Sequence, residues 1–331
     1  MPTLKATPTT APGVLAYKEM AALSRGIGPR LARTSGETQG ARFVKSTFDS
    51  FGYDATILRF PRFTNDPRLA DVVAVKPGRS PLQIIVGGHY DSVKVGRGAF
   101  DNASGIGVML EIAQRLQDVD TPYTIRFIAF GGEEIGMRGS CQYVKQMTSQ
   151  EKANTVLMVN LDSVAGGDML NVYSGGHLVH RRAHLPWSPE TSARQAVRWP
   201  RQEVFRFAKE MGIKIQTSPG LNPHWPAGQT CFCSDHAPFR WAGIPYLYFE
   251  ATNWYIGNKD GWIATRKAGK LWHTRNDTLA FINEEWPGRL HRQLAAVVEL
   301  LQRVLTTPIP AHALPPGGPS VSPSPSGSPS P

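Results

Sequence analysis

A histidine and several carboxylates stand where expected strands end, and residues of these types bind metal ions. His89 and Asp91 come directly after the apolar run 82–86, which has the composition of a buried strand. Asp162 follows a second such run, 156–161. Because ligands bind outside the carboxyl ends of strands in open α/β sheets, we expect these side chains to share one crevice.

Further acidic residues lie at the same kind of position. Glu133 and Glu134 follow the apolar run 124–130, and Asp101 opens the helical pattern 106–116. Burying so many carboxylates without compensation would be very costly, so the pattern predicts a bound cation.

The residue types favour zinc and hydrolysis. Zinc prefers imidazole nitrogen and carboxylate oxygen, and a pair of divalent ions about 3.5–4 Å apart can clamp a carbonyl and activate a water. A further carboxylate must then take the water proton and deliver it to the leaving amine. The adjacent Glu133 and Glu134 allow this division, since consecutive residues leaving a strand point in different directions.

Strand, loop and helix patterns alternate along the chain, which predicts the α/β class. We expect a single domain over 14–307, with a central mixed, mostly parallel β-sheet and helices on both faces. Residues 1–13, rich in Thr, Pro and Ala, read as a flexible leader, and 308–331, rich in Pro and Ser, as a disordered tail.

Composition and charge limit the classes of binding partner that we expect. The chain has 331 residues and a net charge of +10, but no run of five consecutive Lys and Arg, so we expect a solvated basic surface and no nucleic acid partner. No apolar segment approaches the ~20 residues of a membrane span. The tail favours an extracellular or cell-surface location; because no signal peptide is visible, a cytoplasmic location is the alternative. Cys231 and Cys233 form a disulfide or two thiols; a structural zinc site is not expected there.

Several later segments carry weaker signals. We expect a loop over 175–200, a helix over about 201–211, a strand over 213–216 and a closing helix over 283–305. Three histidines in the expected loop have metal-like spacing, but two neighbouring arginines would repel a cation. The histidines, which we interpret as part of a polar loop, are His177, His180 and His184.

Taken together, five separated motifs resemble those of the co-catalytic zinc aminopeptidases of peptidase family M28. The resemblance spans about 87–278. The motifs, in the family's order, are H-x-D at His89, D-N-x-S-G at Asp101, G-x-E-E-x-G-x-x-G-S around Glu133, L-D at Asp162 and H-T-x-x-D-T at His273.

The resemblance implies a zinc-peptidase fold, of the phosphorylase/hydrolase-like type, and a role for each matching residue. Two zinc ions would be held, with Asp101 bridging them. Glu133 would be the general acid/base, and Asp91 would orient His89 through its other ring nitrogen. The implied zinc ligands are His89, Asp101, Glu134, Asp162 and His273.

One position departs from the pattern. Several relatives have Tyr before the last histidine ligand, where it polarises the substrate carbonyl, whereas this chain has Trp272, which offers only an N–H. Tyr246, Tyr248 and Tyr255 are possible substitutes. With Trp before this histidine, the chain also resembles the glutaminyl cyclases, a single-zinc branch of the same fold.

The leading hypothesis is an aminopeptidase that acts on peptides with a free N-terminus. One alternative is a glutaminyl-peptide cyclotransferase. Another is a dipeptidase or carboxypeptidase, for which Arg240 or Arg275 would bind the substrate carboxylate. We predict that the first side chain enters an apolar pocket built by Trp225, Phe232, Trp254 and Tyr255.

Overall fold

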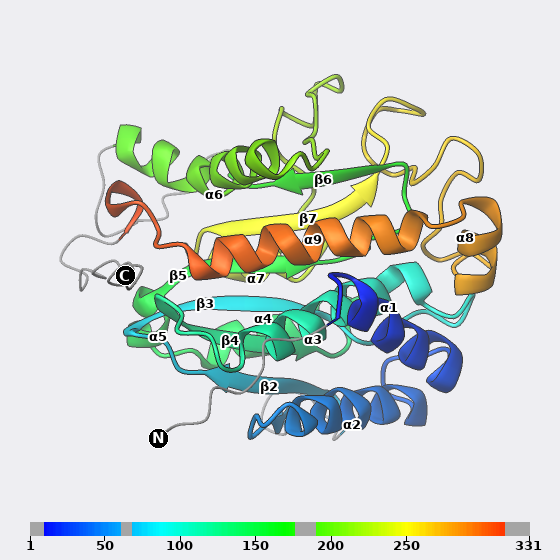
Figure 1. Cartoon of the computed structure of the whole chain (residues 1–331), viewed down its shortest axis with the longest axis horizontal. Helices are drawn as coiled ribbons and strands as arrows, with labels where there is room; N and C mark the ends of the chain where they lie inside the picture. The colour runs from blue at the N-terminus through cyan, green and yellow to red at the C-terminus, as the bar shows by residue number, and fades with distance from the viewer. Residues whose placement is uncertain (1–9, 61–67, 176–189, 315–331) are drawn as a thin grey trace, which may run out of the picture.

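A mixed sheet of seven strands organises the protein, as a computed structural model of the chain shows (Figure 1). The structure describes residues 10–60, 68–175 and 190–314. The strand order across the sheet is β1-β2-β4-β3-β5-β7-β6. The strands are β1 (Thr56–Arg59), β2 (Ala70–Lys76), β3 (Ser80–His89), β4 (Tyr123–Phe130), β5 (Thr155–Leu161), β6 (Met169–Tyr173) and β7 (Tyr246–Thr252).

The centre of the sheet is parallel and its edges are antiparallel. Strands β4, β3, β5 and β7 run in one direction, and β1, β2 and β6 pair with their neighbours in antiparallel fashion. His89, the last residue of β3, lies opposite Phe130, the last residue of β4. The carboxyl ends of these two strands are therefore level, and the loops that follow them start side by side.

Helices cover both faces of the sheet, so the predicted α/β architecture is confirmed (Figure 1). Along β3, Ile84 and Val86 enter the larger core beneath α1, α3 and α9, whereas Ile85 enters a second core beneath α4 and α7. This alternation is the period of two that a strand imposes. The helices are α1 (Val14–Ala21), α2 (Ser35–Ser50), α3 (Ser104–Leu116), α4 (Arg138–Gln146), α5 (Ser149–Asn154), α6 (Glu190–Met211), α7 (His236–Trp241), α8 (Leu279–Glu285) and α9 (Arg289–Thr306).

Two predicted helices have different bounds. Helix α6 begins at Glu190, within the expected loop, and continues through Pro200. Proline is unfavourable inside a helix, but the buried Trp199 and Val204 pack on both sides of it into the large core. The expected closing helix 283–305 is two helices, because the chain turns between α8 and α9 at Gly288, whose φ is 72°.

The expected strand over 213–216 is also wrong. Only Gln216 forms a β-bridge there, to Asn171 on β6. One bridge is too short to make a strand, and the segment serves as a connection along the outside of β6.

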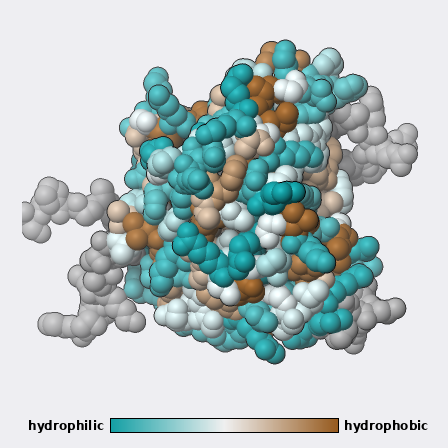
Figure 2. All heavy atoms as spheres, turned by 90° about the vertical axis from the view of Figure 1, so that its right-hand side faces the viewer, coloured by the Kyte–Doolittle hydropathy of each residue, from teal (hydrophilic) through white to brown (hydrophobic). Residues whose placement is uncertain are grey.

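The surface of the described chain combines hydrophilic and apolar residues. Viewed from the right-hand side of Figure 1, apolar residues form separate patches among hydrophilic ones (Figure 2). Within the described ranges, no helix combines the length and apolarity needed to cross a membrane. Ile309 and Ala313 are buried in the large core, so packing continues beyond residue 307, where the tail was expected to begin.

Candidate metal centre and substrate pocket

The predicted ligands meet at the carboxyl edge of the central strands. His89 ends β3, Asp162 follows β5, and Glu134 lies in a short helical turn, η3 (Glu133–Ile135), just after β4. Asp101 lies in the turn η2 (Ala99–Ala103) before α3. His273 arrives from the loop before α8, so segments far apart in the sequence supply the cluster.

The carboxylate of Asp101 lies between the two histidines. Its Oδ1 is 3.2 Å from His89 Nε2, and its Oδ2 is 3.4 Å from His273 Nε2. Asp162 Oδ1 is 3.5 Å from His89 Nε2, and Glu134 Oε2 is 2.7 Å from His273 Nε2. These contacts form two groups of donors, each with one imidazole and one terminal carboxylate, and the groups share Asp101. The two groups lie close together, because ligand atoms of His89, Asp101 and Glu134 are all within 4.8 Å of one another.

Hydrogen bonds to other loops fix the loop that carries Asp101. Asn102 donates from Nδ2 to the carbonyl oxygen of Leu161 at 2.8 Å, and its Oδ1 accepts from the backbone N–H of Ser163 at 3.1 Å. Asn102 therefore ties η2 to both sides of Asp162. On the other side, the buried Asp277 accepts from the backbone N–H of Asp101 at 3.3 Å.

Asp91 fixes the two glutamates as well as contacting His89. Its Oδ1 accepts from the backbone N–H of Glu133 at 3.1 Å, and its Oδ2 from that of Glu134 at 3.2 Å. His89 Nδ1 lies 3.2 Å from the carbonyl oxygen of Asp91 and 3.5 Å from its Oδ1. The predicted contact between Asp91 and His89 is present, and the sequence analysis missed the contacts to the glutamate backbone.

A second supporting network lies behind Asp162. Ser234 donates from Oγ to Asp162 Oδ2 at 2.7 Å, and Asn160 donates from Nδ2 to the same Ser234 oxygen at 2.8 Å. Ser234 opens the run S-D-H-A-P-F at 234–239, a sequence signal that could have identified it, whereas Asn160 looks like an ordinary strand residue. Asp162 is therefore held by Ser234 in the loop before α7, which is itself bonded to Asn160 on β5.

Backbone conformation gives a further sign of a specialised site. His273 and Ser163, the residue after Asp162, have φ values of 58° and 53°. Such left-handed backbone costs roughly 1–3 kcal/mol for a residue other than glycine and is often retained at functional sites. This backbone conformation turns the chain at the candidate ligand His273 and directly after the candidate ligand Asp162.

The pKa values of two buried glutamates indicate that a cation would stabilise the cluster. Burial raises the pKa of Glu134 to about 7, and the nearby Asp101 carboxylate adds to this effect. Burial also raises the pKa of Glu133 well above its ordinary value, with further contributions from Asp235 and Asp162. Within the described chain, the buried Oε1 atom of Glu134 has no hydrogen-bond partner. An unpaired oxygen beside an imidazole and a shared carboxylate fits a zinc ion in ligand type and charge.

A cavity of about 160 Å³ opens in front of the cluster. Asp101, Glu133, Glu134, Asp162 and His273 are among the residues that line this cavity. The remaining lining residues are Ser163, Thr230, Cys231, Cys233, Tyr248, Glu250, Asp260, Gly261, Trp262 and Trp272. Cys231 and Cys233 are paired in a disulfide.

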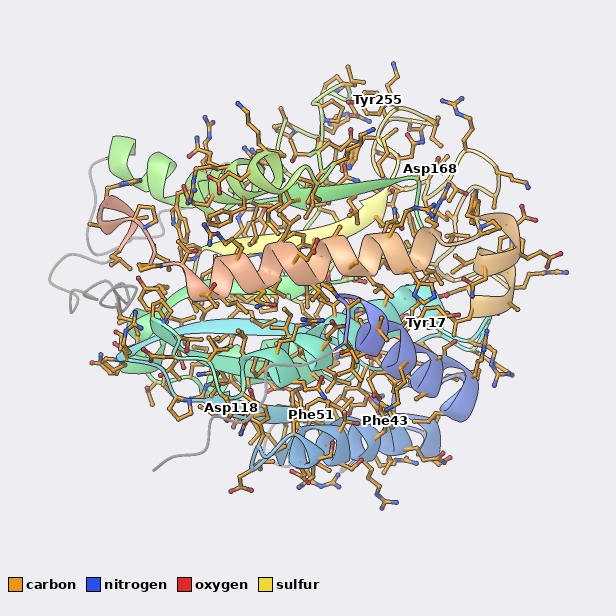
Figure 3. The ribbon with its side chains drawn as sticks, viewed as in Figure 1. Tyr17, Phe43, Phe51, Asp118, Asp168 and Tyr255 are labelled. Carbon is orange, nitrogen blue, oxygen red and sulfur yellow. A yellow bond between two sulfur atoms is a disulfide. The ribbon has the colours of Figure 1, made fainter. Side chains whose placement is uncertain are left out.

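The predicted apolar pocket is wrong, because its four residues lie elsewhere. Trp254 is buried behind the cavity, where its Nε1 donates to the hydroxyl of Tyr173. Phe232 is 44% exposed, and Tyr255, 46% exposed, lies on the outer side of the molecule (Figure 3). Trp225 packs against Trp254. Burial of loop aromatics depends on how the loops fold over the sheet, which local sequence does not reveal.

Tyr248 is the phenol that lines the cavity among the three candidates for a carbonyl partner. Tyr246 donates its hydroxyl to the carbonyl oxygen of Gly175 at 2.6 Å. Trp272 lines the cavity and stacks on Phe100, with ring centroids 5.9 Å apart.

Neither arginine that a carboxypeptidase would use reaches the cavity. Arg240 stacks over the Phe232 ring at 3.8 Å, and Arg275 is exposed. No Lys or Arg of the described ranges lines the cavity. His177, His180 and His184 lie outside the described residues.

Known proteins resemble this chain in sequence over most of its length. An Escherichia coli protein, "Alkaline phosphatase isozyme conversion protein", is 34% identical over 88% of this chain and 89% of its own length. "Aminopeptidase YwaD" of Bacillus subtilis is 29% identical over 69% of this chain. This chain spans only 43% of the YwaD length.

Solved structures share the fold. A zinc aminopeptidase from Bacillus subtilis superposes with a TM-score of 0.65 at 19% identity, covering 92% of this chain and 97% of that one. A glutaminyl cyclase from Porphyromonas gingivalis gives 0.63 at 20% identity, covering 88% and 97%. The model of "Peptidase family M28" matches residues 71–298, which include every candidate ligand. Because this match covers more than half of the chain and agrees with the motif pattern, the protein belongs to peptidase family M28.

Proposed function

We propose that the protein is an aminopeptidase that binds two zinc ions and releases the first residue of peptides with a free N-terminus. The position of Asp101 between His89 and His273 carries this proposal, because it divides the donors into two groups with one shared carboxylate. His89, Asp101 and Asp162 would hold one ion, and His273, Asp101 and Glu134 the other. The printed names of YwaD and the Bacillus subtilis structure support the aminopeptidase class.

Bound zinc would supply a polarised carbonyl and a water of lowered pKa. Side chains of the protein would transfer the protons and bind the substrate carbonyl. Glu133 lines the cavity without contributing to either donor group, so its carboxylate is free to take the water proton and hand it to the leaving amine. Asp91, which accepts from the Glu133 N–H, fixes the backbone from which this carboxylate reaches the cavity. The hydroxyl of Tyr248 is available to donate to the substrate carbonyl oxygen.

Leucine amide and N-acetylleucine amide reporters would test this proposal with purified protein before chelation, after chelation and after zinc return. We expect cleavage of the free-amine reporter alone, loss on chelation and recovery at about two zinc ions per chain by elemental analysis. Recovery at one zinc per chain, with formation of pyroglutamate from glutaminyl peptides, would instead establish the cyclase.

Glu133→Gln isolates the proton transfer from metal binding. We expect kcat to fall by roughly 10²- to 10⁴-fold, as for loss of a general base, with zinc content and unfolding midpoint unchanged. Glu284→Gln, an exposed glutamate on α8, is the matched control and should behave as the wild type. A Glu133→Gln variant that keeps most of its activity with full zinc would exclude Glu133 as the base.

An oxidising location also fits this enzyme. The paired Cys231 and Cys233 support the extracellular or surface location expected from composition, because disulfides persist mainly in oxidising compartments. Thiol labelling of protein isolated from its native cells, with and without reductant, would test this. Full labelling of both cysteines without reductant would contradict it.

A further inference from the structure

Two carboxylates line the cavity in addition to the candidate ligands and Glu133. Glu250 and Asp260 line it together with Trp262 and Trp272. Glu250 lies on β7, so β5 separates it from β3 and His89. Because adjacent strands are about 4.8 Å apart, the β7 backbone is roughly 10 Å from the β3 backbone and roughly 5 Å from that of β5, which Asp162 follows. Glu250 therefore lies two strands away from His89, on the Asp162 side of the cluster.

A chain of hydrogen bonds holds Glu250 in place. The Tyr173 hydroxyl donates to Glu250 Oε2 at 2.9 Å, and Trp254 Nε1 donates to the Tyr173 oxygen at 2.6 Å. Tyr173 and Trp254 are almost completely buried. The Glu250 carboxylate therefore has a fixed direction and one oxygen that no described residue engages.

No basic side chain of the described ranges compensates this carboxylate. Burial raises the pKa of Glu250 to about 8, and the negative Asp162 and Asp101 add to the effect. Lys270 contacts the Trp262 ring, with Nζ 5.3 Å from the centroid, but it does not line the cavity. A cationic group entering with the substrate would supply the missing charge.

The aromatic part of the cavity wall suits a long side chain that ends in a cation. Trp262 and Trp272 both line it, with ring centroids 6.3 Å apart and an angle of 60° between the rings. Aromatic faces bind alkyl stems and attract ammonium or guanidinium groups. Asp260 accepts from the backbone N–H of Trp262 at 3.0 Å, which keeps a second carboxylate beside these rings.

We propose that Glu250, assisted by Asp260, selects substrates whose first residue is lysine or arginine by pairing with the cationic end of that side chain. This inference rests on the proposed aminopeptidase function. The α-amine is the other cation of such a substrate, but it is attached next to the scissile carbonyl and must lie at the cluster of candidate ligands. The side-chain cation is several bonds further away, which matches the position of β7.

Reporter amides of lysine, arginine and leucine provide the test, in the wild type and in Glu250→Gln. Glutamine has the same size, and its amide oxygen still accepts from Tyr173. We expect the wild type to favour lysine and arginine over leucine, and Glu250→Gln to lower kcat/KM for the two basic reporters by roughly 10- to 100-fold, as for a lost charge-assisted hydrogen bond. For leucine the variant should stay within about threefold of the wild type, the effect of a merely neutral contact. Glu210→Gln, on the outside of α6, should change none of these values.

Competitive inhibition gives a second readout that needs no turnover of a basic substrate. Free lysine and norleucine share the alkyl stem and differ in the terminal ammonium. With the leucine reporter, lysine should inhibit the wild type more strongly than norleucine, and Glu250→Gln should remove most of that difference.

The outcomes separate this inference from the proposed function. A wild type that cleaves the leucine reporter and shows no preference for basic residues would overturn the role of Glu250 and leave the aminopeptidase intact. An equal loss on all three reporters in Glu250→Gln would also overturn it, since Glu250 would then bind the α-amine or only support the fold. Zinc-loaded, folded wild type that cleaves none of them would refute both.

Discussion

Replacing Arg30 by lysine would test how the loops around the candidate ligands are held. The guanidinium is completely buried, and burial lowers its pKa to about 10, so it remains charged at neutral pH. It donates to five backbone carbonyl oxygens on segments before and after the His89 strand end. These belong to Leu23, Gly28, Tyr90, Arg97 and Gly98.

The magnitude follows from the number of donors. A guanidinium has five N–H groups in a fixed fork, whereas an ammonium has three on one nitrogen. At least two of the carbonyl groups would therefore lose their donor in Arg30→Lys. A buried polar group left unpaired costs about 1–3 kcal/mol, so the free energy of unfolding should fall by roughly 2–6 kcal/mol, a large part of the ~5–15 kcal/mol that stabilises a typical domain.

Urea unfolding of the metal-free protein, followed by tryptophan fluorescence, would measure this difference. Arg42→Lys, on the exposed side of α2, is the matched control and should stay within about 0.5 kcal/mol of the wild type. If Arg30→Lys also unfolds within about 1 kcal/mol of the wild type, the five contacts do not hold these loops and the reasoning fails.

Two further perturbations test the core and its pH response. Glu111 on α3 accepts from the backbone N–H groups of Gly13 and Ala16 at the start of α1. Glu111→Ala removes both acceptors and should cost about 2–4 kcal/mol in urea unfolding, and a value near zero would show that α1 needs no such cap. Burial lowers the pKa of His236 to about 3, so only the unfolded chain takes up this proton as pH falls below about 6.5. Stability should therefore decline from pH 6.5 towards pH 3 with a contribution of up to ~1.4 kcal/mol per unit. His236→Asn should give a shallower decline, and parallel curves for the two proteins would contradict this origin.

Local patterns predicted the parts of the structure that depend on strand ends. Short apolar runs are buried on both faces of a parallel sheet, so their limits are visible in the sequence. His89 and Asp162 follow directly from such limits, and the structure brings them within 3.5 Å. Glu133 and Glu134 follow in the same way from β4. The resemblance to family M28 contributed His273, whose place after a polar loop carries no strand signal.

Features decided by long-range packing were not predicted. The limits of α6 depend on Trp199 and Val204 entering a core formed by distant helices, whereas local rules treat Pro200 as a helix breaker. Glu250 was missed because it lies within a strand, although Tyr246, Tyr248 and Glu250 alternate and so face the same side. Only the folded chain reveals that this side is the floor of the cavity.

The candidate centre is assembled by side chains that bind the backbone of other loops, and this has a consequence for metal binding. Asp91 accepts from the N–H groups of Glu133 and Glu134, Asn102 contacts both neighbours of Asp162, and Asp277 accepts from the Asp101 N–H. None of these bonds uses an atom that a zinc ion would need. The loops are therefore fixed in position without metal, and the mutual repulsion of the carboxylates is the cost that a bound cation would relieve. Metal binding should accordingly stabilise a fold that already exists, in contrast to small domains that fold only around their zinc.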